Sequence, residues 1–116
     1  ELVAVAEVGS MALAMAAIDR AYDHLKLCQD AGWTTPPDHP DLVHAQQALL
    51  LKEGLVESAR HLSEGFDDLF LQWMRESAAM ATRLEGALEA AEHQVASEAL
   101  VDLKASCARC HDAYRN

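Results

Sequence analysis

The placement of helix-breaking residues restricts the fold of this 116-residue chain more than any other feature of its sequence. All three prolines lie between residues 36 and 40, and only 5 glycines are present. Ala, Leu and Glu dominate the rest of the chain; these residues favour helices, and β-branched residues are few. We therefore expect an all-α protein, and the length suits one domain, residues 1–116, rather than two.

Apolar residues recur at spacings of three and four along the first half of the chain, which is typical of helices with one buried face. A first helix is expected from about Leu2 to Gln29, with Gly32 as its C-terminal stop. The stretch Trp33 to Pro40 holds the prolines and is the expected long loop. Asp41 then caps a second helix from Leu42 to about His61. The apolar face of the first helix comprises Val8, Met11, Met15, Ile18, Tyr22 and Leu25.

The second half of the chain contains two further helical segments. Ser63 to Gly65 is the expected break, a third helix runs from Phe66 to Leu88, and a boundary follows between Ala90 and Gln94. The last helix has the clearest pattern, because its apolar residues alternate in steps of four and three, as in a coiled-coil seam. That seam comprises Ala96, Leu100, Leu103, Cys107, Cys110 and Tyr114. Four helices with mostly short connections predict an antiparallel four-helix bundle.

Residues 107 to 111 read Cys-Ala-Arg-Cys-His, which is the C-x-x-C-H spacing of haem attachment. Two cysteines one helical turn apart can reach the two vinyl groups on one edge of a porphyrin. The histidine that follows the second cysteine projects beneath the ring, where a ring nitrogen can reach the iron. We therefore predict one covalently attached haem c, held by Cys107 and Cys110 on the C-terminal helix, with His111 as an iron ligand.

Three other interpretations of the two cysteines are weaker. A thioredoxin-like redox pair normally belongs to a βαβ unit, and no such pattern surrounds this motif. A zinc site needs four ligands, so His111 and a distant residue such as Cys28 would have to complete it. A disulfide between Cys107 and Cys110 would close a very short loop and would stabilise little.

The sequence from Ser106 to Arg115 resembles the C-terminal signature of the class II c-type cytochromes, which comprise cytochrome c prime and its low-spin relatives. In that family the haem motif ends a four-helix bundle and is followed by an aromatic residue and an arginine, as Tyr114 and Arg115 follow it here. The resemblance implies a left-handed antiparallel bundle and, with the c-type attachment, a periplasmic location in a bacterium. It also implies that Arg115 lies beside His111, screens the imidazole and contacts a diatomic ligand on that side.

Met15 and Met11 are the candidates for the opposite side of the iron. In the resembling family a residue of the first helix faces that side, and counting back from Gly32 puts Met15 nearest to its position, with Met11 one turn earlier. A thioether is a good soft sixth ligand for haem iron, so we predict ligation by Met15, with Met11 as the second candidate. The alternative is that both methionines fill gaps in the core.

Three functions fit these expectations. The first is a monohaem electron carrier whose iron is six-coordinate, with His111 and a methionine as ligands. The second is a five-coordinate protein that binds nitric oxide or carbon monoxide, as cytochrome c prime does. The third is a haem sensing module of a larger protein. No nucleophile–base arrangement, catalytic carboxylate pair or phosphate-binding glycine loop is recognisable in the sequence, so we do not expect an enzyme.

The chain is acidic, with 19 Asp and Glu against 9 Lys and Arg and a formal net charge of −10. The basic residues form no cluster of the kind that contacts nucleic-acid phosphates, so a nucleic-acid partner is not expected. The acidity either makes the surface self-repelling or steers the protein towards a basic redox partner. We expect no membrane span, since the apolar run Leu49–Leu51 is followed at once by Lys52 and Glu53.

The apolar face of the first helix is wider than a single seam, because Leu13, Ala17 and Ala21 flank it. Members of the resembling family commonly form dimers through their first two helices. We therefore expect a homodimer in which this face packs against a second copy of the chain.

Overall fold

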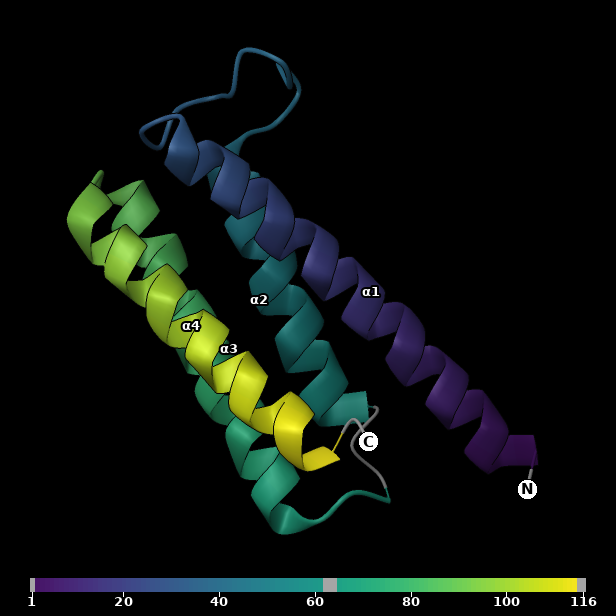
Figure 1. Cartoon of the computed structure of the whole chain (residues 1–116). Coiled ribbons are helices and arrows are strands. Elements are labelled where there is room, and N and C mark those ends of the chain that lie inside the picture. The colour runs from purple at the N-terminus through teal and green to yellow at the C-terminus, as the bar shows by residue number, and fades with distance from the viewer. Residues whose placement is uncertain (1, 62–64, 115–116) are drawn as a thin grey trace.

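Four helices make up the computed structural model, which describes the backbone of residues 2–61 and 65–114 and the side chains of residues 10–60 and 65–113. They are α1 (Leu2–Asp30), α2 (His44–His61), α3 (Asp68–Glu89) and α4 (His93–Tyr114), and no strand occurs in these ranges. Successive helices run in opposite directions, so the predicted all-α, antiparallel four-helix bundle is confirmed (Figure 1). None of the helices, over their described residues, is long and apolar enough to cross a bilayer.

Each helix packs mainly against its neighbours in the chain: α1 on α2, α2 on α3, and α3 on α4. Gly54 lets α1 approach α2 closely, because a Cβ atom at this position would lie 2.9 Å from Cγ1 of Ile18. By contrast, α1 and α4 do not pack closely along their described lengths (Figure 1). The α1–α4 edge is therefore a loosely packed side of the bundle.

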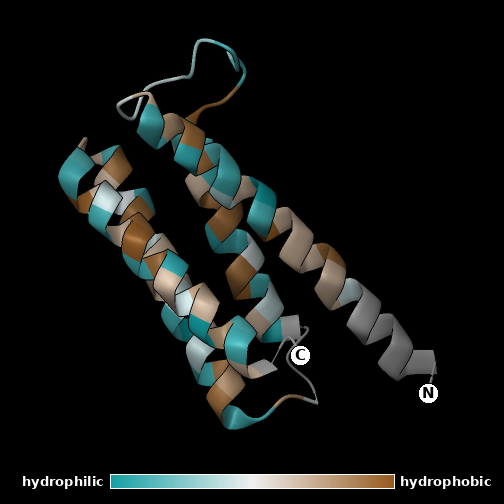
Figure 2. Ribbon diagram, viewed as in Figure 1, coloured by the Kyte–Doolittle hydropathy of each residue, from teal (hydrophilic) through white to brown (hydrophobic). Residues whose placement is uncertain are grey.

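The core forms where the apolar faces of the helices meet (Figure 2). On α3 the predicted face is buried at Phe70, Met74, Ala81, Leu84 and Leu88. Phe66, which was expected on this face, precedes the helix and is 40% exposed; it stacks on Phe70 with 4.2 Å between the ring centroids. The predicted face of α3 is therefore correct, except at its first residue.

The predicted face of α1 divides into a buried part and a half-buried part. Ile18 and Leu25 belong to the core, whereas Met11, Met15 and Tyr22 are partly buried and pack against it. The side chain of Val8 lies outside the described residues. The half-buried side chains of α1 therefore keep apolar surface that a bound molecule or another chain could cover.

α1 ends at the predicted stop. Gly32 has a φ of +74°, its N–H bonds the carbonyl of Gln29 at 2.9 Å, and the N–H of Trp33 bonds the carbonyl of Cys28 at 2.8 Å. These two bonds define a Schellman motif, which ends a helix with a residue in the left-handed region. Trp33 is buried, and its indole N–H donates to Oγ of Ser97 at 2.9 Å, so the loop is anchored on α4.

α2 begins later than predicted, at His44 rather than Leu42, and Asp41 lies in a turn instead of capping the helix. The N–H of Leu42 bonds the carbonyl of His39 at 3.1 Å, and its own carbonyl accepts the hydroxyl of Thr35 at 2.9 Å. The side chain of Leu42 is buried. The leucine therefore anchors the loop in the core, and the helix starts only after it.

The two connections around α3 lie at the predicted breaks, although α3 begins at Asp68 rather than at the predicted Phe66. Asp67 caps α3, since its carboxylate accepts the backbone N–H of Phe70 at 2.8 Å. Gly65, with a φ of +93°, belongs to the preceding break, of which Ser63 and Glu64 lie outside the described residues. After α3, Ala91 is left-handed, with a φ of +57°, within the predicted boundary between Ala90 and Gln94.

Candidate functional site

The C-x-x-C-H motif occupies the last two turns of α4, so helix geometry fixes where its side chains project. Successive residues of an α-helix are rotated by about 100°, so Cys107 and His111 project within about 40° of one another, with Cys110 about 60° to the other side. Cys110 is buried, and Cys107 and His111 are half-buried. Two thiols and an imidazole are thus presented on one face of one helix.

This face is directed towards α1. The thiol of Cys107 is close enough to Tyr22 for the two groups to interact electrostatically: the pKa of Tyr22 is raised, first by burial and then by Cys107. Asp19, on the same helix, contributes in turn to the raised pKa of Cys107. The middle of α1 therefore lies beside the first cysteine of the motif, at the α1–α4 edge.

The antiparallel arrangement extends this register to the methionines. Residues that follow Cys107 in α4 lie beside residues that precede Asp19 in α1, because the two helices run in opposite directions. Met15 is one turn before Asp19, and His111 is one turn after Cys107, so Met15 and His111 lie at the same level of the bundle. Met11 lies one turn further along. Met15 is thus placed at the level of His111, one turn beyond the level of Cys107.

Arg115, the remaining predicted site residue, lies outside the described residues, as does the side chain of Tyr114. The contact expected between Arg115 and His111 stays a prediction.

The thiols of the motif do not have the properties of a catalytic redox pair. Burial, together with Cys110 and Asp19, raises the pKa of Cys107 to about 11. Burial also raises the pKa of Cys110, against the opposing effect of Arg109. Catalytic C-x-x-C pairs have a lowered pKa, because the thiolate is the nucleophile. Both cysteines are free and remain protonated at neutral pH, which disfavours the thioredoxin-like interpretation.

The alternative of a zinc site is also disfavoured. Cys28 is fully buried in the last turn of α1, where burial raises the pKa of its thiol. Within residues 10–60 and 65–113, no group of three His, Cys, Asp or Glu side chains is arranged to hold a metal ion. The imidazole of His24 is directed to α2, since its Nδ1–H donates to Oε1 of Gln47 at 3.0 Å.

Two sets of contacts around the motif were not anticipated from the sequence. Arg109, between the two cysteines, pairs with Glu76 at 2.9 Å and lies over the ring of Trp73, with 4.5 Å from Cζ to the centroid. Ser106, just before the motif, shares a buried hydrogen bond of 2.6 Å with Ser77. Both sets connect α4 to α3, and no local pattern in the sequence signals a contact between residues about thirty positions apart.

The chain was compared with protein-family models, with curated proteins and with solved structures, and nothing matches it.

Proposed function

We propose that this protein is a c-type monohaem cytochrome that carries electrons, with the haem attached through Cys107 and Cys110 and with His111 as an iron ligand. One observation carries the proposal: a single helical face presents two free thiols, one turn apart, and the adjacent imidazole towards the loosely packed α1–α4 edge. On this proposal the protein is related to the class II c-type cytochromes.

The residues at this edge fit such a group. The thiols of Cys107 and Cys110 are free, as required before they add to vinyl groups. On the facing helix, Met11, Met15 and Tyr22 are only partly buried, so their remaining surface is available to an apolar disc. Burying that surface would stabilise the folded protein by about 25 cal/mol for each Å² removed from water.

The chain's own residues then have distinct tasks. When bound, the haem would supply one-electron oxidation and reduction of its iron. Cys107 and Cys110 would keep it on the chain, and His111 would orient it from α4. Tyr22 would exclude water from the α1 side, and the neutral thioether of Met15 is a ligand that can be buried without an unpaired charge.

A second function, binding of nitric oxide or carbon monoxide at a five-coordinate iron, has one observation in its favour. Met11 and Met15 already pack against the core. If packing is their whole role, neither sulfur would be a ligand and the site opposite His111 would accept a diatomic gas. The test of Met15 below separates the two functions.

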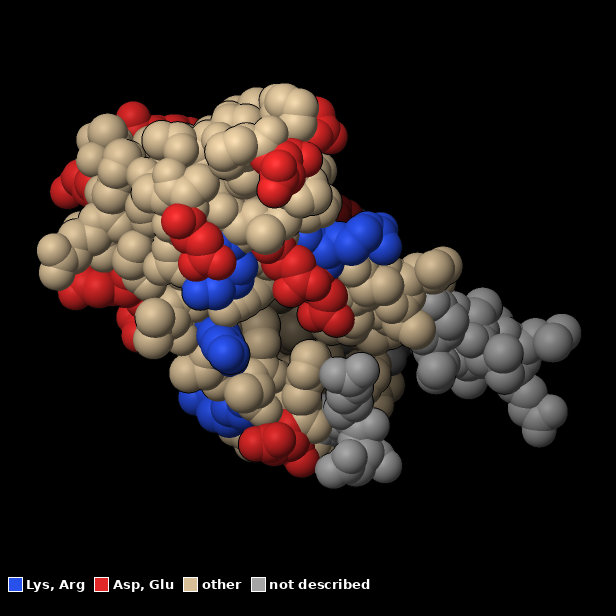
Figure 3. Space-filling view, turned by 45° about the horizontal axis from the view of Figure 1, so that its top comes forward, with Lys and Arg blue, Asp and Glu red and all other residues tan. Residues whose placement is uncertain are grey.

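The proposal also concerns location and partners. c-type attachment is expected in the bacterial periplasm, and the net charge of −10 favours a basic redox protein as the partner. The face drawn in Figure 3 mixes acidic side chains with basic ones. We also propose that the exposed apolar residues of α1 and α2 pair two copies of the chain.

Covalent attachment is the decisive test. The chain, produced in cells that make c-type cytochromes, should retain its haem when it is denatured in acidified acetone. A Cys107→Ala, Cys110→Ala double variant should release it, and Cys28→Ala, the matched control, should retain it. Mass spectrometry of the denatured chain measures the bound haem. Free extraction of haem from the unaltered protein, or failure to bind haem, would overturn the proposed function.

A further inference from the structure

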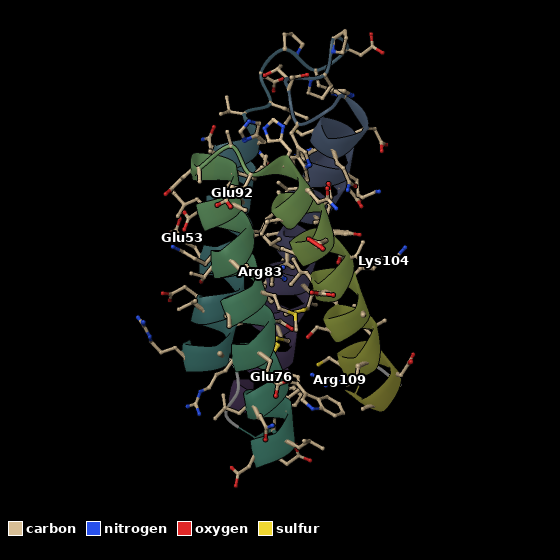
Figure 4. The ribbon with its side chains drawn as sticks, turned by 90° about the vertical axis from the view of Figure 1, so that its left-hand side faces the viewer. Glu53, Glu76, Arg83, Glu92, Lys104 and Arg109 are labelled. Carbon is tan, nitrogen blue, oxygen red and sulfur yellow. The ribbon has the colours of Figure 1, made fainter. Side chains whose placement is uncertain are left out.

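Arg109 is held by two side chains of α3. Its guanidinium donates to Oε1 of Glu76 at 2.9 Å and lies 4.5 Å above the centre of the Trp73 ring. Glu76 is itself fixed, since its other oxygen accepts the side-chain amide of Gln72 at 3.0 Å. Arg109 lowers the pKa of Glu76, so the carboxylate stays charged. Figure 4 shows Arg109 and Glu76 together where α3 and α4 meet. We call Trp73, Glu76 and Arg109 the Arg109 cluster.

The position of Arg109 on the helix determines what this cluster can do. Arg109 projects about 160–200° away from Cys107 and His111 around the axis of α4. A contact that directs Arg109 to α3 therefore directs Cys107 and His111 away from α3. Cys107 helps to raise the pKa of Tyr22, and Asp19 helps to raise the pKa of Cys107; both Tyr22 and Asp19 belong to α1, so this direction leads to α1.

A second contact fixes the same rotation one turn earlier. Ser106 bonds Ser77 at 2.6 Å in the buried interface between α4 and α3. Both contacts therefore join the last turns of α4 to the first half of α3. Two separate contacts on the same side restrict rotation of this helix end more than either one does alone.

We infer that Arg109 is a positioning residue: with Trp73 and Glu76 it sets the rotation of the last two turns of α4, so that Cys107 and His111 face α1. This inference rests on the proposed function for what the face binds, but the rotation itself is a property of the chain without haem. Arg109 touches no reacting atom and acts through the helix.

The test compares two ion pairs of the same kind. Arg109→Gln removes the cation from the Arg109 cluster, whereas Arg109→Lys preserves a cation. Arg83→Gln is the matched control, because Arg83 forms a similarly exposed pair between α3 and α4 with Asp102, at 3.1 Å and away from the motif (Figure 4). Each variant is prepared with and without haem.

Two readouts are measured. Without haem, amide hydrogen exchange in residues 107–113 should quicken about fivefold in Arg109→Gln, as expected on losing one exposed ion pair and one cation–π contact. With haem, the Arg109→Gln preparation should contain chains that hold their haem through only one cysteine, and its ferrous spectrum should be altered. Arg109→Lys should restore both readouts, and Arg83→Gln should leave both unchanged.

The outcomes separate this inference from the proposed function. If Arg109→Gln matches Arg83→Gln in exchange and in attachment, the positioning role is refuted even though the protein binds haem. If the unaltered protein binds no haem but Arg109→Gln still quickens exchange at the end of α4, the proposed function fails and the role of Arg109 in setting the helix rotation is supported.

Discussion

At the level of single residues, Met15 distinguishes electron transfer from gas binding. It lies at the level of His111, and its thioether is partly buried against the core. Replacing Met15 with alanine removes the sulfur, so we expect the ferrous iron to become high-spin and to bind carbon monoxide. The optical spectrum of the reduced protein, with and without carbon monoxide, measures both changes.

Met80→Ala is the control for this substitution, because Met80 is also partly buried against the core but lies on α3. Both variants should lose about 1–2 kcal/mol of stability from the removed apolar surface, and only Met15→Ala should change the spectrum. A change in Met11→Ala instead would make Met11 the ligand. If neither Met15→Ala nor Met11→Ala changes the spectrum, the five-coordinate, gas-binding function is the correct one.

At the level of elements, the end of α3 is strained by Ala91. This residue has a φ of +57°, and its N–H bonds the carbonyl of Leu88 at 3.2 Å in a Schellman motif. A left-handed conformation costs about 1–2 kcal/mol for a residue with a Cβ atom and nothing comparable for glycine. Allowing for the greater freedom of glycine in the unfolded chain, Ala91→Gly should raise the free energy of unfolding by about 0.5–1 kcal/mol.

Urea denaturation followed by circular dichroism measures this difference. The adjacent Ala90 has an ordinary φ of −87°, so Ala90→Gly should gain nothing and should lose about 0.5 kcal/mol. Equal effects of the two substitutions would show that the conformation of Ala91 is not strained.

The helix ends and the motif also show which features are predictable from sequence. The stop at Gly32 and the spacing from Cys107 to His111 are local, because each depends on neighbouring residues of one chain segment. The start of α2 was predicted too early, since the sequence does not reveal that Leu42 is buried as a loop anchor. The Arg109 cluster was missed for the same reason: its partner Glu76 is 33 positions away in the chain.

At the level of the whole molecule, His44 makes stability depend on pH. It is the first residue of α2, its ring lies edge-on to Trp33 with 6.4 Å between centroids, and its Nδ1 is buried without a partner among the described residues. The pKa of His44 is lowered, first by burial and then by His93 at the start of α4. The unfolded chain therefore binds a proton more readily than the folded one.

The free energy of unfolding should accordingly be highest, as far as His44 determines it, above the ordinary histidine pKa of about 6.5. It should decrease as the pH falls below that value. One proton limits the slope to about 1.4 kcal/mol per pH unit. Urea denaturation at several pH values between 5 and 8 measures the slope. His44→Gln should flatten it, and His39→Gln, in the exposed loop, should not. An unchanged slope in His44→Gln would assign the effect to another group.

The assembly of the molecule depends on the outer seam between α1 and α2. The hydrogen bond from His24 to Gln47 crosses this seam. By helix geometry the exposed apolar residues nearest to it are Leu13 and Leu27 of α1, Leu50 of α2, and Val43, which directly precedes α2. Such a surface, shared by two antiparallel helices, can pack against the same surface of a second copy related by a twofold axis.

We therefore expect the protein to sediment as a dimer at high concentration. Leu13 is 75% exposed and Leu50 is 50% exposed, so glutamate at both positions should leave each subunit folded but place like charges across the twofold axis. The double variant should sediment as a monomer with unchanged helical content. Val101→Glu is the control, because Val101 is 65% exposed on α4, away from the seam, and this variant should remain dimeric. A monomer at every concentration of the unaltered protein, or equal dissociation of Val101→Glu, would show that the seam does not join two copies.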